Sequence, residues 1–219
     1  MKFSTWAGTY RDRRQAGEVL AERLADYRER DDVIVLGLVR GGVPVAAEVA
    51  QRLGVPLDVL VVRKLGVPWA PEVAFGALGP RGVRVLNTEI ADRLESRAID
   101  QVTEQEATEL VRREQAYRPD RPPLELSGKV AIVVDDGLAT GATARAAVQV
   151  ARTLGAATVV VAVPVGSVEA AELLKQDADL LICPLAPPSF GAVSRFYADF
   201  HQVTDDEVRD LLAETGPSR

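Results

Sequence analysis

The stretch that decides the fold is KVAIVVDDGLATGATARAAV, Lys129–Val148. It begins with the apolar run Val130–Val134, which shows no polar alternation and is typical of a strand buried on both faces of a parallel sheet. Asp135 and Asp136 follow at the carboxyl end of that strand, where ligands bind in open α/β sheets. From Thr140 the pattern becomes helical. The segment therefore predicts a strand, a ligand-binding loop and a helix in direct succession.

The loop Gly137–Thr143 has the features of an anion site. Its backbone N–H groups and the dipole of the following helix favour a phosphate, and the hydroxyls of Thr140 and Thr143 add donors. A Walker A loop would carry Lys before its final Thr, but Ala142 stands there. A Rossmann loop would need G-x-G-x-x-G after the first strand, which this sequence does not have. The pattern predicts a site for one phosphate beside two carboxylates suited to ribose hydroxyls.

Composition fits a globular α/β protein. The chain has 219 residues, 47% hydrophobic and 26% charged, which is enough for a full core in one domain. No apolar run approaches membrane-spanning length and the first residues lack the apolar core of a signal peptide, so we expect a cytoplasmic protein with no membrane partner. The net charge of −6 argues against a nucleic-acid partner. The single Cys183 excludes an internal disulfide and is interpreted as a core residue.

Apolar patterns along the chain alternate between strands and helices. Strands are predicted at residues 33–38, 57–62, 130–134, 158–164 and 179–183, and helices at 12–28, 44–53, from 140, at 168–175 and at 204–213. One or two short strands are expected within 73–86, a loop at 65–76, and a polar helical segment at 88–118. Strands separated by helices imply right-handed crossovers. The predicted fold class is α/β, a central parallel sheet flanked by helices on both faces.

A second glycine-rich loop follows the first strand. In this loop Gly41 and Gly42 let the backbone approach an anion, and Arg40 supplies positive charge. The basic pair Arg63 and Lys64 follows the second predicted strand, at the same edge of the sheet. The alternatives are a glycine-rich turn with a surface Arg and a solvated basic pair.

The segment Asp135–Thr143, DDGLATGAT, resembles the 5-phosphoribosyl-1-pyrophosphate (PRPP) motif of the type I phosphoribosyltransferases. The resemblance implies that Asp135 and Asp136 are the catalytic residues, which hold the ribose hydroxyls and, through ribose or water, Mg²⁺. It also implies a set of residues around the 5′-phosphate: Ala139, Thr140, Gly141, Ala142 and Thr143.

The same resemblance places the pyrophosphate of PRPP at the second loop and the basic pair. The residues implied are Arg40, Gly41, Gly42, Arg63 and Lys64. The peptide bond Val39–Arg40 is expected to be cis, and residues 65–76, together with part of the following polar helical segment, are expected to act as a mobile lid. Mg²⁺, the implied cofactor, would neutralise the leaving group while held mostly by substrate oxygens.

In this family a hood of terminal segments recognises the base. The resemblance implies a single domain over residues 1–219, with a hood from 1–14 and 184–219. The aromatic residues Phe190, Phe196 and Tyr197 either stack on the base or pack the terminal helix onto the sheet. Asp199 resembles an acidic residue that reaches a second metal, and His201, with no evident partner cluster, is interpreted as a surface or packing residue.

The function implied is that of a Mg²⁺-dependent phosphoribosyltransferase, which joins the ribosyl 5-phosphate of PRPP to a nitrogenous base and releases pyrophosphate. Ala139 stands where hypoxanthine and guanine enzymes usually have an acidic residue, which disfavours an oxopurine. The base is left open, and a homodimer is common in the family. One alternative is a PRPP-binding regulator without catalysis, which should carry a nucleic-acid-binding module. Another is a hydrolase or phosphatase of ribose phosphates, which would need a nucleophile or a metal cluster.

Overall fold

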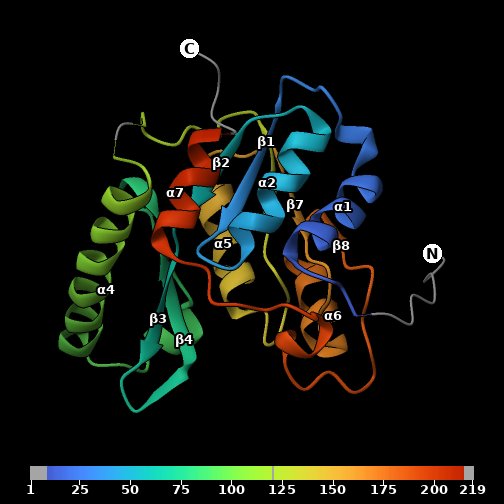
Figure 1. Ribbon diagram of the computed structural model, residues 1–219. Helices are drawn as coiled ribbons and strands as arrows, with labels where there is room; N and C mark the ends of the chain where they lie inside the picture. Colours follow the sequence, from blue (N-terminus) through green and yellow to red (C-terminus); the bar gives the residue numbers. More distant parts are fainter. Residues whose placement is uncertain (1–8, 120, 215–219) are drawn as a thin grey trace.

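A parallel sheet forms the centre of the computed structural model, which describes residues 9–119 and 121–214 (Figure 1). Its five strands run in the order β2-β1-β6-β7-β8, and every neighbouring pair is parallel. The strands are β1 (Val33–Leu38), β2 (Leu57–Leu60), β6 (Val130–Val134), β7 (Thr158–Ala162) and β8 (Leu180–Ile182). The predicted strands are confirmed, although the second ends at Leu60 rather than at residue 62 and the fourth at Ala162 rather than at residue 164.

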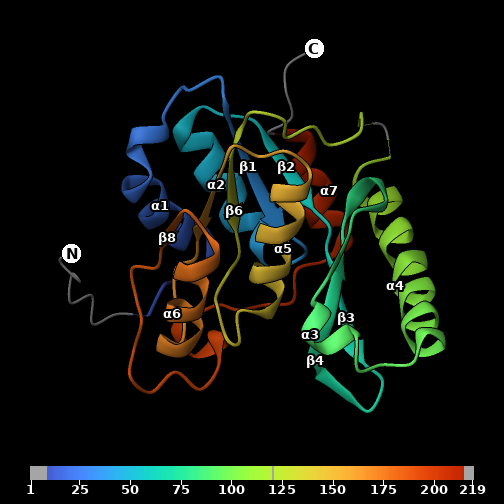
Figure 2. The same cartoon turned by 180° about the vertical axis from the view of Figure 1, so that it is seen from behind.

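Helices cover both faces of this sheet, as predicted (Figures 1 and 2). One face carries α1 (Arg13–Arg23), α2 (Gly42–Leu53) and α7 (Asp205–Glu214). The other face carries α5 (Ala142–Thr153) and α6 (Val168–Asp177). Short 3-10 turns lie at Ala25–Tyr27, Pro80–Gly82 and Val193–Phe196. The fold class is therefore an α/β sandwich around a parallel sheet.

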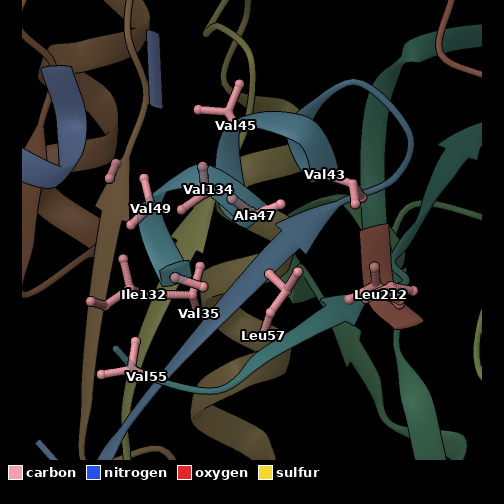
Figure 3. Packing of buried hydrophobic residues seen from close by; sticks show 14 of the residues in the cluster. Val35, Val43, Val45, Ala47, Val49, Val55, Leu57, Ile132, Val134 and Leu212 are labelled. Carbon is pink, nitrogen blue, oxygen red and sulfur yellow. The ribbon is translucent and has the colours of Figure 1, made fainter. Parts of the chain in front are cut away.

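The sequence of the central strand β6 lacks polar alternation because the strand is buried on both faces. Ile132 and Val134 point into the core beneath α2, where they pack with Val35 and Val49 (Figure 3). Val133, between them, points into the second core beneath α5. Burying such a side chain fully contributes about 1.5–3 kcal/mol, so both faces of the strand stabilise the fold.

The prediction of a loop at residues 65–76 is wrong. The segment lies in an antiparallel hairpin of β3 (Arg63–Val67) and β4 (Ala70–Leu78), to which β5 (Arg84–Leu86) adds a third strand. The two prolines suggested a loop, but Pro68 lies in the turn with Trp69, and Pro71 lies beside the irregular pairing near Gly66. The expected short strands within 73–86 are confirmed.

The polar segment 88–118 forms α3 (Thr88–Ala91) and the long α4 (Ser96–Tyr117), as predicted. Although its outer face is exposed, α4 covers the hairpin: its residues Ile99, Val102 and Ala107 pack on a small core that contains Leu65 and Phe75. The hairpin and α4 thus project together beside the parallel sheet (Figures 1 and 2). No helix in the described ranges combines the length and the apolar character needed to cross a membrane.

Candidate functional site

Two adjacent carboxylates stand where β6 ends. The N–H of Asp136 donates to Asp135 Oδ1 at 2.9 Å. Arg13, at the start of α1, donates to Asp136 Oδ2 from Nε at 3.0 Å and from Nη2 at 2.9 Å. The Arg13 side chain is only 7% exposed. The pair predicted from the sequence therefore exists, and one member is held by a buried guanidinium.

Burial raises the pKa values of both carboxyl groups of this acidic pair. Burial, and then the neighbouring Asp136, raise the pKa of Asp135 well above its usual value. Burial also raises the pKa of Asp136, while the charge of Arg13 and its hydrogen bonds act in the opposite direction. A second negative charge is thus disfavoured until a cation or hydroxyl donors reach the pair. Such hard oxygen atoms fit Mg²⁺ that keeps most of its ligands from substrate and water.

Sequence reasoning missed Arg13 as a site residue. Besides Asp136, it donates from Nη1 to the carbonyl of His201 at 2.9 Å, and its guanidinium lies 3.9 Å from the ring centre of Phe200. The sequence placed Arg13 only within a terminal segment and a helix. Its partner lies 123 positions away, so no local pattern connects the two residues.

The loop after the acidic pair is tied to the next strand connection. The N–H of Leu138 donates to the carbonyl of Val165, and the N–H of Ser167 returns a bond to the carbonyl of Leu138, both at 2.8 Å. Ser167 Oγ also donates to the carbonyl of Ala139 at 2.8 Å. Gly141 adopts the left-handed φ of +77° that glycine allows, and α5 begins at the next residue.

This geometry leaves donors free at the start of α5. The backbone N–H groups of residues 139–141 donate to no acceptor within residues 9–119 and 121–214. Thr140 Oγ1 accepts weakly from the N–H of Ala142 at 3.4 Å. The five residues predicted around a phosphate thus form one short loop with unused donors at a helix N-terminus.

The second glycine-rich loop lies against the acidic pair. Its bond Val39–Arg40 is cis, as expected. A Cβ on Gly41 would lie 2.2 Å from Asp136 Oδ2, and a Cβ on Gly42 would lie 2.5 Å from the carbonyl oxygen of Val134. Because β1 and β6 are parallel neighbours, their following loops meet at one edge of the sheet.

The basic residues predicted from the sequence already have partners. Arg40 Nη1 pairs with Asp205 Oδ1 of α7 at 3.4 Å, and Arg63 Nε pairs with Glu106 Oε2 of α4 at 2.6 Å. Arg63 and Lys64 come shortly after β2 ends at Leu60, as expected, and they also begin β3. Sequence reasoning missed both acidic partners because each belongs to a helix distant in the chain.

Two clefts are lined by some of the predicted residues, but Asp135, Asp136 and Arg40 line neither of them. The hairpin cleft, of about 470 Å³, is lined by residues from the second loop, the hairpin, α4 and α5, among them Val39, Arg63, Lys64 and Thr143. The α5 cleft, of about 460 Å³, is lined by Lys64, Thr140 and Ala142 together with residues of the hairpin sheet and α3. Lys64 lines both, so the predicted basic pair and the predicted phosphate loop adjoin one another.

Aromatic residues near both ends of the described chain form a cluster over the site. The rings of Tyr10 and Tyr197 are 5.5 Å apart, and those of Phe190 and Phe196 stack at 5.4 Å. Tyr197 is buried and its hydroxyl donates to the backbone carbonyl of Asp136 at 2.6 Å, which makes it a packing residue. Of the expected hood, residues 1–14 and 184–219, the parts 1–8 and 215–219 lie outside the described residues, and α7 packs on α2 and α4.

His201 does have a partner cluster, contrary to the expectation from the sequence. Its Nε2 lies 3.0 Å from Glu207 Oε1 and its Nδ1 lies 3.3 Å from Asp199 Oδ1. These contacts, first Glu207 and then Asp199, raise the pKa of His201. In the described part of the chain no three His, Cys, Asp or Glu side chains gather as a metal site. Asp199 as a metal ligand therefore stays a prediction.

Comparison with known proteins agrees with this geometry. A family model described as a phosphoribosyl transferase domain matches residues 10–201. A Mycobacterium tuberculosis protein, provisionally named a phosphoribosyl transferase, is 51% identical over 203 residues, which are 92% of this chain and 46% of that protein. The chain thus spans about half the length of the curated relatives it matches. A crystal structure of a Thermus thermophilus protein superposes with a TM-score of 0.88 at 43% identity, covering 95% of this chain and 99% of that one.

Proposed function

Because the chain belongs to the phosphoribosyl transferase domain family, we propose that it transfers the ribosyl 5-phosphate of PRPP to a nitrogenous base and releases pyrophosphate. One observation carries the proposal. The acidic pair, the phosphate-type loop after it and the second glycine-rich loop meet at one sheet edge, where Gly41 lacks the Cβ that would fall 2.2 Å from Asp136 Oδ2. Such a site offers carboxylates to ribose hydroxyls and separate donors to the phosphates at either end of PRPP.

The proposed reaction requires the protein mainly to position the substrates and to compensate charge. Departure of pyrophosphate leaves positive charge on the ribose ring and negative charge on the leaving group, so catalysis consists mainly of positioning and of compensating charge. Asp135 and Asp136 would hold the ribose hydroxyls, and residues 139–143 the 5′-phosphate. Bound Mg²⁺, held by the acidic pair through ribose or water, would neutralise the leaving group.

The base would lie under the aromatic cluster. Tyr197 is committed to the backbone of Asp136, which leaves Phe190 and Phe196, both only partly buried, as the rings that can face a flat ligand. Ala139 offers no proton-transfer group at its position in the loop. We therefore propose a base that needs no acidic side chain at this position.

Calorimetric titration with PRPP, with and without Mg²⁺, tests this function. We expect micromolar binding that depends on Mg²⁺. Thr140→Val should weaken it by about 1.5–3 kcal/mol at most, the value of a hydrogen bond to a charged group. Thr153→Val, the same change at an exposed hydroxyl that bonds the carbonyl of Gln149, should leave the dissociation constant unchanged. A screen of bases for pyrophosphate release then follows.

Each result of this experiment has one meaning. Absence of PRPP binding would overturn the proposed function. Binding without pyrophosphate release from any base would favour a PRPP-responsive regulator. An unchanged dissociation constant in Thr140→Val would place the 5′-phosphate outside this loop.

A further inference from the structure

The hairpin cleft is lined partly by α4, a helix outside the parallel sheet and its loops. Its lining includes Arg63 and Lys64 of the hairpin, Thr143 of α5, and Glu106 and Arg113 of α4. Three basic side chains and one acidic side chain line the cleft among the residues described. The acidic one, Glu106, is paired with Arg63 at 2.6 Å. The cleft therefore suits an anion with more than one negative charge.

Arg113 can bind such an anion without leaving its helix partner Glu109 unpaired. Its Nε pairs with Glu109 Oε1 at 2.7 Å, while its Nη groups donate to no acceptor in the described ranges. Arg112 holds the same Glu109 with two bonds, from Nε at 2.7 Å and from Nη2 at 2.8 Å. These two guanidinium groups, Arg112 first, lower the pKa of Glu109 to about 2. Glu109 thus keeps a bidentate partner when Arg113 turns to a ligand.

The backbone around Arg113 is held in place by buried neighbours. Leu110 and Tyr117 of α4 are each 5% exposed and belong to the main core. The hydroxyl of Tyr117 donates to Asp205 Oδ1 at 2.8 Å, the same oxygen that pairs with Arg40 of the second loop. This half of α4 is therefore fixed relative to the glycine-rich loop, and Arg113 lies at a fixed place in the cleft wall.

We infer that Arg113 is an additional ligand of the pyrophosphate group, supplied by α4 to the cleft that Arg63 and Lys64 also line. The inference rests on the proposed function and names one residue of the same site. A guanidinium suits this task because it donates in two directions to phosphate oxygens and keeps its charge at all relevant pH values.

Two neighbouring arginines allow a matched test. Arg113→Met and Arg112→Met each remove one guanidinium from Glu109, but only Arg113 lines the cleft. Titration with Mg²⁺ and inorganic pyrophosphate should show a dissociation constant raised roughly tenfold or more in Arg113→Met. It should rise much less in Arg112→Met, which keeps Arg113 in the cleft wall but leaves it to pair with Glu109. Ribose 5-phosphate, which has no pyrophosphate group, should bind both variants like the wild type. Arg113→Lys should recover part of the affinity, because it restores the charge.

The outcomes separate this inference from the function beneath it. If the wild type binds neither PRPP nor pyrophosphate, the proposed function is wrong and this inference falls with it. If the wild type binds both, and Arg113→Met and Arg112→Met bind pyrophosphate equally well, only the role of Arg113 is wrong. Weaker binding of ribose 5-phosphate by Arg113→Met would also overturn it, because the effect would not be confined to the pyrophosphate end.

Discussion

The guanidinium of Arg13 holds the carboxylate of Asp136 through two hydrogen bonds, of 3.0 and 2.9 Å, across 123 positions of sequence. This contact joins the first helix to the loop after β6, and the same guanidinium binds the carbonyl of His201. It therefore connects the start of α1 and the segment 200–201 to the acidic pair. Because the guanidinium is buried, its charge acts on Asp136 with little screening by solvent.

Replacing Arg13 should change how PRPP binding depends on pH. Asp136 must be ionised to accept ribose hydroxyls, and Arg13 lowers a pKa that burial raises. In Arg13→Met the acid limit of PRPP binding should therefore move to higher pH, whereas Arg13→Lys should move it less. Calorimetric dissociation constants across a pH series measure this limit. Arg14→Met is the control, because Arg14 is exposed and pairs with Glu48; the same limit in Arg13→Met and wild type would contradict the idea.

The two aspartates should affect stability in opposite directions. Asp135 is half-buried and forms no ion pair with the described residues, so Asp135→Asn should raise the free energy of unfolding although it removes a proposed ribose ligand. Asp136→Asn leaves Arg13 buried without its counter-charge and should cost about 3 kcal/mol, within the range for breaking a buried pair. Each kcal/mol appears as roughly 2–4 °C in Tm for a chain of this size. Thermal melts at pH 7 measure both, and changes of the same sign would contradict this account.

The gain from Asp135→Asn should depend on pH. The raised pKa means that folded Asp135 keeps its proton while the unfolded residue has lost it, so wild-type stability falls as pH rises between those two pKa values. Below the unfolded pKa, near 3.9, the residue is neutral in both states and the variant should gain nothing. A Tm difference that is constant from acid to neutral pH would show that burial of the charge is not the cause.

Sequence patterns predicted most of the fold because its central strands carry a strong pattern. A run such as Val130–Val134, buried on both faces, contrasts clearly with the amphipathic helices around it. The hairpin of β3 and β4 could not be recognised in the same way. Its alternation of apolar and polar residues is short. Pro68 and Pro71 suggest a loop, because the sequence does not show that Pro68 lies in the turn between two strands.

The site residues also differ in how well the sequence could place them. Residues that follow a strand, such as Asp136 and Gly41, could be placed from local pattern, because the ends of parallel strands meet at one edge. The partners of the site residues could not be placed in this way. Arg13 pairs with Asp136, Asp205 with Arg40, and Glu106 with Arg63. These pairs are separated by 123, 165 and 43 positions of sequence, and only the packing of the helices brings them together.

Gly41→Ala should damage binding more than folding. The backbone at Gly41 has φ −58° and ψ −32°, which alanine adopts freely, but a Cβ would lie 2.2 Å from Asp136 Oδ2. The carboxylate must move, so PRPP affinity should fall by tenfold or more, by roughly 1.4 kcal/mol at least. Gly128→Ala is the contrasting control: its φ of +71° penalises alanine but the space around it is open, so stability should fall and affinity should not. Equal affinities for wild type and Gly41→Ala would separate this loop from the ribose site.

His201 should stabilise the fold only in acid. Glu207 and Asp199 raise its pKa, so its contribution is fully present below the unfolded pKa near 6.5 and is lost as pH rises through the folded value. His201 is 56% exposed, so the loss in His201→Gln should be small, within about 0.2–1 kcal/mol at pH 5.5. At pH 9 the imidazole is neutral and the two proteins should melt at nearly the same temperature. Differential scanning calorimetry at both pH values measures this difference. A destabilisation as large at pH 9 as at pH 5.5 would show that His201 acts by packing and not by charge.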